Sequence, residues 1–324
     1  MTRAMPSVSV LMPCYNEASY IEDALRSLAD DYVMAKGEIL VIDGMSTDGT
    51  QAIVLSLIDE GLPIRLLINE KRFLTFGLNL GITMAEGEII VRADAHGVYP
   101  PRYVERCVDL LESSDAANVG GVMQPKGKSP VQEAVALALR HPLGVGDAAW
   151  RLGRSNGYVD TVYLGTFRKK LFAEIGLYDA RAIANEDAEL NLRILKAGKR
   201  IFLDNSLKVT YFPRATFKAL ARQFLNYGKG RCMTVLQHKK LTSPRQLAPV
   251  ALLLLLILSV VPAFFSPLWL LAPAFYAVFL LAGALFSWPG KSISIKTRLL
   301  MAAAFATMHL AWGAGFLLWL IRRK

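Results

Sequence analysis

The sequence is poor in cysteine and in acidic residues. Its 324 residues include three cysteines, which lie far apart at Cys14, Cys107 and Cys232. This small, odd number fits neither a disulfide framework nor a zinc site, and it is typical of a protein in a reducing compartment. Acidic residues number 27 against 37 basic ones, so the formal net charge is +10 at pH 7.

The shortage of acidic residues is greatest at residues 196–245. Twelve basic residues occur there with a single acid, Asp204. Because an apolar region follows directly, we expect this stretch to contact anionic membrane headgroups, although a solvated basic face would look the same. Nucleic acid is not an expected partner, because no recognised binding motif occurs and the aromatic residues are scattered.

Charge is absent altogether from residues 250–288 and again from residues 299–321. Both runs are long enough for a helix to cross a bilayer, which needs ~20 residues. Ser266 and Pro267 interrupt the first run, which predicts two helices there and about three in all. The sequence therefore predicts three parts: a cytoplasmic domain at residues 1–214, a basic amphipathic interface segment at 215–245, and a membrane domain at 246–324.

Positive residues around the apolar runs leave the membrane topology open. If the first domain is cytoplasmic, Lys296 and Arg298 lie inside, as the positive-inside rule requires. After three crossings Arg322 would lie outside, against that rule. One segment is therefore either a third span or a re-entrant or interfacial helix. No cleavable signal peptide is expected, because the first residues lead directly into a strand.

Short apolar runs alternate with amphipathic stretches over the first hundred residues. We expect strands at residues 7–12, 38–42, 64–68 and 88–91, with helices between them. Ile21, Leu25 and Leu28 recur at helical spacing and should form the buried face of the first helix. This alternation predicts an α/β fold with a mostly parallel sheet and helices on both faces.

The stretch RADAHGVYPP at residues 92–101 follows the fourth expected strand. Ligands bind at the carboxyl ends of strands in open α/β sheets. Asp94 and His96 are two residues apart, so in extended backbone their side chains would leave on the same face and share one cation. A lone Asp-x-His is weak evidence by itself, since such a histidine is often an ordinary hydrogen-bonded loop residue.

Four blocks in this order carry a family resemblance: VSVLMPCYNEASYIEDAL, EILVIDGMSTDGT, GLNLGITMAEGEIIVRADAH and NEDAELNLRILKAG. Together they resemble the inverting glycosyltransferases of family 2, which have a Rossmann-like GT-A fold. The form DAH, the stretch RQFLNYGKGR and the apolar tail are similar to a family member of succinoglycan biosynthesis. The resemblance implies a UDP-sugar donor bound by Pro13, Tyr15, Asn16, Glu17, Asp43, Ser46 and Asp94.

The same resemblance implies a catalytic base and a metal. Asp187 matches the family's base, which takes a proton from the acceptor hydroxyl, and Glu186 would orient the acceptor. Acids at a helix start are also simply favoured by the helix dipole. Asp94 and His96 would hold the metal, and the histidine in place of the family's second Asp favours Mn²⁺ over Mg²⁺.

The acceptor side is predicted from two further segments. VYLGTFR at residues 162–168 matches the family's stretch that lines the acceptor pocket. Gln223, Lys229 and Arg231 stand where processive relatives carry Gln-x-x-Arg-Trp, and they would reach the diphosphate of the donor or of a lipid. An apolar stripe with basic residues between its members makes an interfacial helix the other interpretation of residues 217–231.

The function expected from the resemblance is transfer of a hexose, glucose from UDP-glucose, to a polyprenyl-diphosphate-linked sugar in exopolysaccharide synthesis. Alternatives are transfer to a polyprenyl monophosphate or lipid headgroup, and a catalytically silent membrane scaffold that binds nucleotide sugar. The expected location is the inner membrane of a bacterium, as a multi-pass protein with its catalytic domain in the cytoplasm. Its apolar region could also pair two copies into a homodimer.

Overall fold

The computed structural model describes residues 5–153, 156–182, 184–239, 244–288 and 292–322. The chain divides into two compact units. The first, here called the sheet unit, comprises Met1–Gln124, Ala149–Ala182 and Glu186–Tyr211. The second, the helical unit, comprises Pro125–Ala148, Ile183–Asn185 and Phe212–Lys324. The three-part division expected from the sequence stays a prediction.

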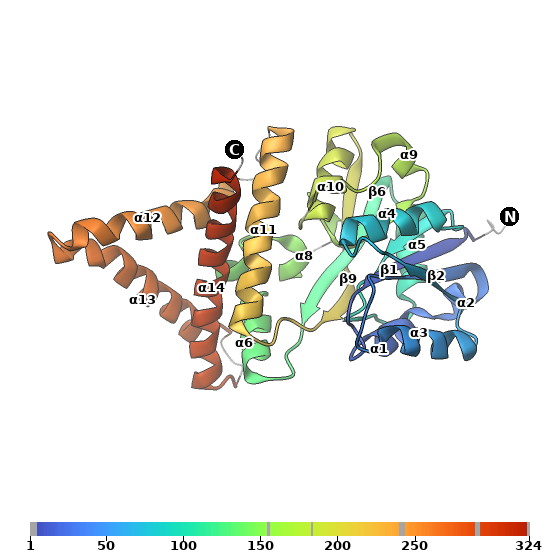
Figure 1. The fold of residues 1–324 in the computed structure, drawn as a ribbon, viewed down its shortest axis with the longest axis horizontal. Coiled ribbons are helices and arrows are strands. Elements are labelled where there is room, and N and C mark those ends of the chain that lie inside the picture. Colours follow the sequence, from blue (N-terminus) through green and yellow to red (C-terminus); the bar gives the residue numbers. More distant parts are fainter. Residues whose placement is uncertain (1–4, 154–155, 183, 240–243, 289–291, 323–324) are drawn as a thin grey trace. The chain divides into compact units, whose positions relative to one another are not determined.

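The described strands of the sheet unit form one nine-stranded sheet of order β3-β2-β1-β4-β8-β6-β9-β5, with β7 paired to β9 (Figure 1). They are β1 (Val8–Cys14), β2 (Gly37–Asp43), β3 (Ile64–Ile68), β4 (Ile89–Arg92), β5 (Gly97–Val98), β6 (Ala116–Pro125), β7 (Gly157–Tyr158), β8 (Tyr163–Arg168) and β9 (Arg200–Tyr211).

Strands β1 to β4 pair in parallel, which confirms the four strands expected from the sequence. The later strands make the sheet mixed, because β8 is antiparallel to both β4 and β6, and β9 is antiparallel to β5 and β7. Since β1, β2 and β4 are parallel, their carboxyl ends meet at one edge of the sheet. The loops after them carry most of the predicted donor-binding residues.

Helices pack against this sheet through apolar faces. The described helices of the sheet unit are α1 (Ile21–Leu28), α2 (Asp31–Lys36), α3 (Thr50–Asp59), α4 (Leu74–Met84), α5 (Tyr103–Ser113), α8 (Ala149–Leu152), α9 (Leu171–Ile175) and α10 (Glu186–Lys196). Ile21, Leu25 and Leu28 are fully buried, as their spacing predicted. Gly81 lets α4 approach the sheet closely, because a Cβ there would come within 3.1 Å of Ile42 and Leu11.

The helical unit is built around one long helix. Its described helices are α6 (Pro130–Ala138), α7 (Pro142–Val145), α11 (Phe217–His238), η1 (Pro244–Leu247), α12 (Ala248–Ala263), η2 (Pro267–Leu270), α13 (Leu271–Phe286) and α14 (Ile295–Ile321). The chain turns between α12 and η2, which confirms the break predicted at Ser266 and Pro267. By length and composition, Pro267–Phe286 and Ile295–Ile321 could cross a membrane.

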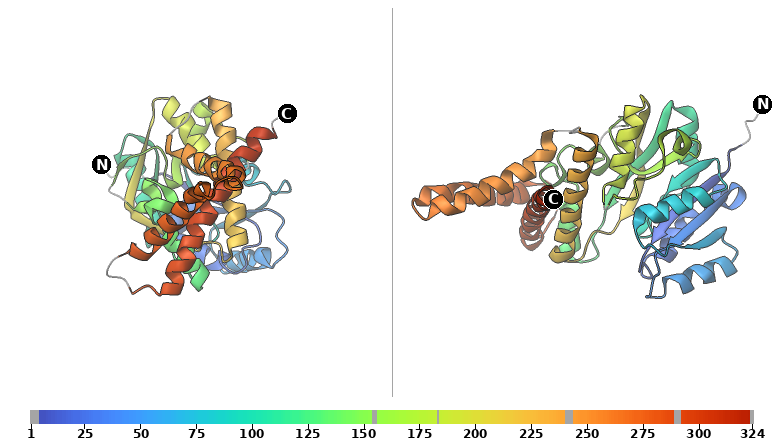
Figure 2. Two further views of the ribbon diagram at one scale, coloured as in Figure 1. Left: turned by 90° about the vertical axis from the view of Figure 1, so that its left-hand side faces the viewer. Right: turned by 45° about the horizontal axis from the view of Figure 1, so that its top comes forward.

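Helices α11 and α14 lie side by side at very short separation (Figures 1 and 2). A Cβ at Gly228 of α11 would overlap the backbone oxygen of Trp312, and one at Gly315 of α14 would overlap that of Leu225. Small residues that let two backbones approach in this way are typical of helix pairs in apolar surroundings. Leu220 and Phe224 of the predicted apolar stripe are buried in the helical unit.

Candidate active site

The loops that follow β1 and β2 are joined by hydrogen bonds between backbone amides and short side chains. The Asn16 N–H donates to Ser46 Oγ over 2.8 Å, and the Asn16 side-chain oxygen accepts from the Thr47 N–H over 2.9 Å. The Glu17 N–H donates to Thr50 Oγ1 over 2.9 Å. Asn16 has a φ of 55°, a left-handed conformation that asparagine adopts more readily than most residues. The structure therefore brings together the predicted nucleotide residues Asn16, Glu17 and Ser46.

Asp43 ends β2 and is fully buried beneath these loops. Its Oδ2 accepts from the Ser46 N–H over 2.9 Å and from Gln51 Nε2 over 2.6 Å, and its Oδ1 lies 3.6 Å from Cys14 Sγ. Burial, together with the Asp43 charge, raises the pKa of the Cys14 thiol. Asp43 has no exposed surface, and its contact with a uracil ring stays a prediction. Pro13 lies within β1, and Tyr15 beside it is 49% exposed.

The chain turns directly after β4, at Asp94. The Gly97 N–H donates to the Asp94 backbone oxygen over 3.2 Å, so the extended backbone expected between Asp94 and His96 is wrong. The Tyr99 hydroxyl stabilises the turn by accepting from the Asp94 N–H over 2.6 Å and donating to the Asp94 backbone oxygen over 3.0 Å. The Asp94 carboxylate accepts from the Tyr163 hydroxyl over 3.0 Å. The prediction from residue spacing failed here because the buried Tyr99 stabilises the turn.

His96 contacts the loop after β1. Its Nδ1 lies 3.1 Å from Glu17 Oε1, and its ring meets that of Tyr211 edge-on at 5.4 Å. His96 and Asp94 thus stand at one turn with different neighbours. No group of three or more His, Cys, Asp or Glu side chains in the described ranges is arranged to hold a metal ion.

A buried cation that the sequence interpretation left without a role lies between the predicted base and the turn. Arg92 ends β4 and its side chain is 6% exposed. Its guanidinium pairs with Asp187, with Glu186 at 2.8 Å and with Asp94 at 3.8 Å. Burial alone lowers the pKa of an arginine, but the three carboxylates outweigh it and raise the pKa of Arg92. The sequence signal that could have identified Arg92 is a single arginine after an apolar run. A charge buried at that position requires charged or polar partners.

Asp187 has the environment of a proton acceptor. It lies in the first turn of α10, and 27% of its side chain remains exposed. Burial raises the pKa of Asp187 from 3.8 to about 6, Arg92 opposes that rise, and Glu186 adds to it. The Tyr178 hydroxyl donates to Asp187 Oδ1 over 3.2 Å. A carboxylate with a pKa just below neutrality is ionised at pH 7 and still accepts a proton in a reaction.

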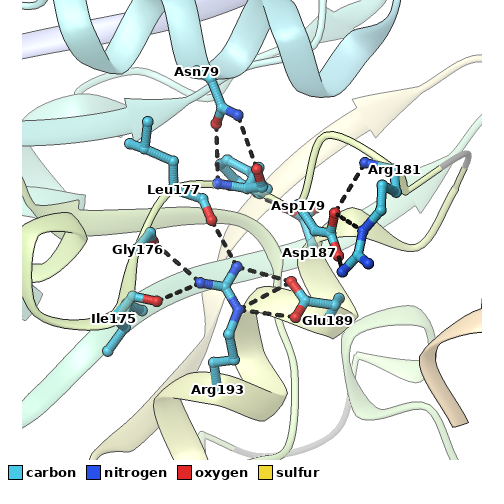
Figure 3. A network of polar contacts seen from close by, with 10 residues as sticks. Asn79, Ile175, Gly176, Leu177, Asp179, Arg181, Asp187, Glu189 and Arg193 are labelled. Atoms are coloured by element: carbon cyan, nitrogen blue, oxygen red, sulfur yellow. Dashed lines mark hydrogen bonds and ion pairs between the residues drawn. The ribbon is translucent and has the colours of Figure 1, made fainter. Parts of the chain in front are cut away.

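The loop that carries Tyr178 is fixed by Arg193 from α10 (Figure 3). The Arg193 guanidinium donates to the backbone oxygens of Ile175, Gly176 and Leu177 over 2.5, 3.2 and 2.8 Å, and it also pairs with Glu189. On the other side of the loop, Asn79 donates to the Tyr178 backbone oxygen and accepts from its N–H. The backbone before the base is therefore held from two elements, α4 and α10.

The predicted acceptor residues fall in both units. Residues 163–168 form β8, and Tyr163 stacks on Trp150 while its hydroxyl contacts Asp94. Gln223 lies on α11 of the helical unit and donates to the Tyr227 hydroxyl over 3.0 Å. Lys229 and Arg231 lie on the same helix and are partly exposed. Diphosphate binding by these three residues stays a prediction.

Comparison with known proteins connects this geometry to a family. The model of "Glycosyl transferase family 2" matches residues 9–176. The chain is 33% identical to the succinoglycan biosynthesis protein ExoA of Rhizobium meliloti (strain 1021) over 318 residues, which cover 95% of this chain and 93% of that protein.

A second relative comes from Methanococcus voltae: dolichyl N-acetyl-alpha-D-glucosaminyl phosphate 3-beta-D-2,3-diacetamido-2,3-dideoxy-beta-D-glucuronosyltransferase. It is 26% identical over 240 residues, 71% of this chain and 74% of that protein. Among solved structures, the mannosyltransferase PcManGT from Pyrobaculum calidifontis, in complex with GDP-Man and Mn²⁺, has a TM-score of 0.60 at 21% identity. That likeness covers 98% of this chain and 88% of the other.

These likenesses confirm the GT-A fold and the enzyme class that the four sequence blocks predicted. The family match spans the loops after β1, β2 and β4, where the predicted donor-binding residues Asn16, Ser46 and Asp94 lie. The ExoA likeness extends over α10 and its carboxylate Asp187 as well. The chain therefore belongs to glycosyl transferase family 2.

Proposed function

We propose that this protein is a metal-dependent, inverting hexosyltransferase that moves glucose from UDP-glucose to a polyprenyl-diphosphate-linked sugar at a bacterial inner membrane. The observation that carries the proposal is the paired environment of Asp187: buried enough to raise its pKa to about 6, and held by Arg92 and Tyr178. The name of the ExoA relative supports exopolysaccharide synthesis as the setting.

Asp187 acts as the base in this proposal. It takes the proton from the acceptor hydroxyl, whose oxygen attacks the anomeric carbon on the face opposite the departing UDP. One base is sufficient because inversion requires one displacement. Arg92 holds Asp187 and Glu186 together, so Glu186 is available to orient the acceptor while Asp187 keeps its rotamer.

The donor nucleoside is held by the loops after β1 and β2. Tyr15 offers an exposed ring beside the carboxyl end of β1, while Asn16 and Ser46 hold the two loops in register. Pro13 and Asp43 lie beneath them and keep the strand ends rigid. Specificity for glucose over galactose depends on hydrogen bonds to one hydroxyl, which a screen of donors can test.

The donor set at the turn after β4 fits a divalent cation. Asp94 supplies a carboxylate, and His96 supplies an imidazole beside the Glu17 carboxylate. When bound, the metal would stabilise the charge of the departing diphosphate as a Lewis acid. In this proposal the diphosphate oxygens complete the coordination of the metal, because the described residues contain no group of three or more protein ligands. The imidazole favours Mn²⁺, because Mg²⁺ prefers hard oxygen ligands.

The acceptor's lipid diphosphate is assigned to the basic helix α11. Lys229 and Arg231 carry the positive charge, and Gln223 adds a polar side chain. Guanidinium and ammonium groups bind phosphate oxygens through charge-assisted hydrogen bonds. Replacing Lys229 and Arg231 with glutamine should raise the KM for the lipid acceptor and leave the KM for the donor unchanged.

The test is UDP release by purified full-length protein in detergent, with UDP-glucose, Mn²⁺ and galactosyl-diphosphate-polyprenol. We expect release that requires the lipid and is lost in Asp187→Asn and Asp94→Ala. Asp179→Asn is the matched control, because Asp179 pairs with the exposed Arg181 and its loss should leave activity in place. Undiminished release by Asp187→Asn would refute its role as the base.

A second candidate acceptor is a polyprenyl monophosphate that bears a sugar, which the name of the Methanococcus relative favours. Release with this lipid, and none with the diphosphate, would replace the acceptor and keep the base. Retained UDP binding without release for any pair of substrates would support a silent scaffold instead.

A further inference from the structure

The two helices that are long and apolar enough to cross a membrane have different surroundings. Within its most apolar 18 residues, Pro267–Phe286 has 11% of positions buried, whereas Ile295–Ile321 has 33%. Length and hydropathy alone do not separate a spanning helix from the core helix of a folded unit. The residues that pack against each helix do distinguish a spanning helix from a core helix.

Helix α14 is covered along its middle by protein. Between residues 300 and 317, Ala303 is the one exposed position, and all of these residues are described. Helices α6, α7, α11, α12 and α13 pack against α14. A membrane span in a unit with so few helices would fully expose large apolar side chains to lipid at its middle, whereas Leu310 and Trp312 of α14 are only partly exposed.

The helices that cover α14 carry charged side chains. Lys218 and Arg222 are exposed on α11, and Glu133 is exposed on α6. In the middle of α14, the His309 ring contacts the Tyr276 hydroxyl at 3.0 Å and the backbone oxygen of Leu143 at 2.6 Å. If α14 crossed the bilayer, these charges and the short helix α7 with Leu143 would be carried toward the hydrocarbon, which is strongly unfavourable.

The hairpin of α12, η2 and α13 has the opposite character. No charged residue occurs at residues 250–288. At its turn Phe264, Phe265 and Leu268 are 84%, 88% and 70% exposed, and Phe275 farther along is 74% exposed. Figure 1 and the right-hand view of Figure 2 show α12 and α13 leaving α14 and meeting at this turn, away from the other helices of the helical unit. So much exposed apolar surface is stable only in lipid or against another protein.

The base of the hairpin is polar, as expected where helices leave a membrane. Arg298 at the start of α14 donates to the backbone oxygens of Ala284, Leu285 and Ser287, which closes the end of α13. Arg140 lies over the Trp288 ring at 5.5 Å. Arginine and tryptophan at a helix end are typical of the headgroup region.

We propose that the hairpin of α12, η2 and α13 is the only described segment that enters the bilayer, and that α14 lies at the membrane surface without crossing it. Both ends of α14 then stay on the same side of the membrane as the sheet unit. This placement keeps Lys296, Arg298 and Arg322 on one side and satisfies the positive-inside rule, which three crossings would violate. It does not depend on which sugar the enzyme transfers.

The test is the side of the membrane at which Arg322 lies. Full-length Arg322→Cys, made in a bacterial host, is treated with a membrane-impermeant maleimide in intact spheroplasts and after permeabilisation. Glu60→Cys is the matched control, because Glu60 is exposed on the sheet unit. The native Cys14, Cys107 and Cys232 are buried, so the parent protein supplies the background.

We expect Arg322→Cys to behave as Glu60→Cys does and to react only after permeabilisation. Labelling of Arg322→Cys in intact spheroplasts, with Glu60→Cys protected, would overturn the proposal, because α14 would then cross. A second pair of variants tests the insertion itself. Val261→Arg should shift the protein out of the membrane fraction, whereas Ala303→Arg should not; equal loss from both would place α14 in the hydrocarbon.

Discussion

The two halves of the candidate active site are held together by different chemistry. The loops after β1 and β2 are joined mainly by separate neutral hydrogen bonds, such as that from the Asn16 N–H to Ser46 Oγ, with one to a carboxylate, from the Ala18 N–H to Asp48 Oδ2. The turn after β4 and the start of α10 instead share one buried guanidinium, that of Arg92. Separate neutral bonds contribute singly, so losing one weakens the loops a little. A shared buried charge is needed by all of its partners at once, so its loss should disrupt them together.

The largest effect is expected from Arg92→Ala, which would leave three carboxylates without their cation. We expect the free energy of unfolding to fall by about 3–5 kcal/mol and transfer to be lost. Thermal unfolding of the detergent-purified protein and UDP release would measure both. Arg92→Lys keeps the positive charge but lacks the planar guanidinium that donates to several carboxylates at once. It should therefore recover stability more than activity. An unfolding temperature of Arg92→Ala equal to that of the parent protein would contradict the central role of this residue.

The next effect concerns the loop that presents Tyr178. Arg193→Ala removes donors from three backbone oxygens and the partner of Glu189, and hydrogen bonds to charged groups contribute about 1.5–3 kcal/mol. We expect kcat to fall about tenfold or more while the KM for UDP-glucose stays constant. Arg181→Ala, which removes an exposed pair with Asp179, serves as the control and should have little effect. Unchanged kcat in Arg193→Ala would show that the loop does not need this anchor.

A pH profile tests Asp187 without any change in sequence. Because burial raises the pKa of Asp187 to about 6, the protonated and inactive form accumulates as pH falls through 6. We expect kcat/KM to fall about tenfold per pH unit below that value and to level off above it. Any residual activity of Asp187→Asn should not show this fall at low pH. A limb that persists in Asp187→Asn would assign the titration to another group.

The smallest effect is expected in the neutral half of the site. Ser46→Ala removes the acceptor of the Asn16 N–H, and one such hydrogen bond contributes about 0.5–1.5 kcal/mol. The KM for UDP-glucose should rise a few-fold with kcat unchanged, as initial rates would show. A collapse of activity as large as that in Arg92→Ala would remove the contrast between the two halves.

Sequence patterns were sufficient for the parts of the fold that depend on local order. Apolar runs predicted β1 to β4, and helical spacing predicted the buried face at Ile21, Leu25 and Leu28. These signals work because a strand or helix repeats its buried side at a fixed interval along the chain. The four sequence blocks likewise indicated the family: three of them overlap the matched residues 9–176 and include residues of β1, β2 and β4, and the fourth contains α10.

Contacts between distant residues were decided by the tertiary structure alone. Arg92 and Glu186 are 94 positions apart, and the sequence around either residue does not predict their ion pair. The turn at Asp94 lies only five residues from Tyr99, but the position of the Tyr99 hydroxyl there depends on the burial of its ring in the sheet unit. Later strands, from β6 to β9, pair antiparallel or at a distance, so their order did not follow from the parallel alternation before them.

The apolar region shows the same limit. Its sequence predicted about three apolar helices with a break at Ser266 and Pro267, and among the described residues two of these helices are long enough to cross a membrane. It did not determine which of them is covered, because hydropathy measures composition, whereas burial depends on neighbours such as α6 and α11 that lie far away in the chain. Packing therefore separates the covered helix α14 from the exposed hairpin, since side chains that are equally apolar bury themselves against protein in one case and remain free in the other.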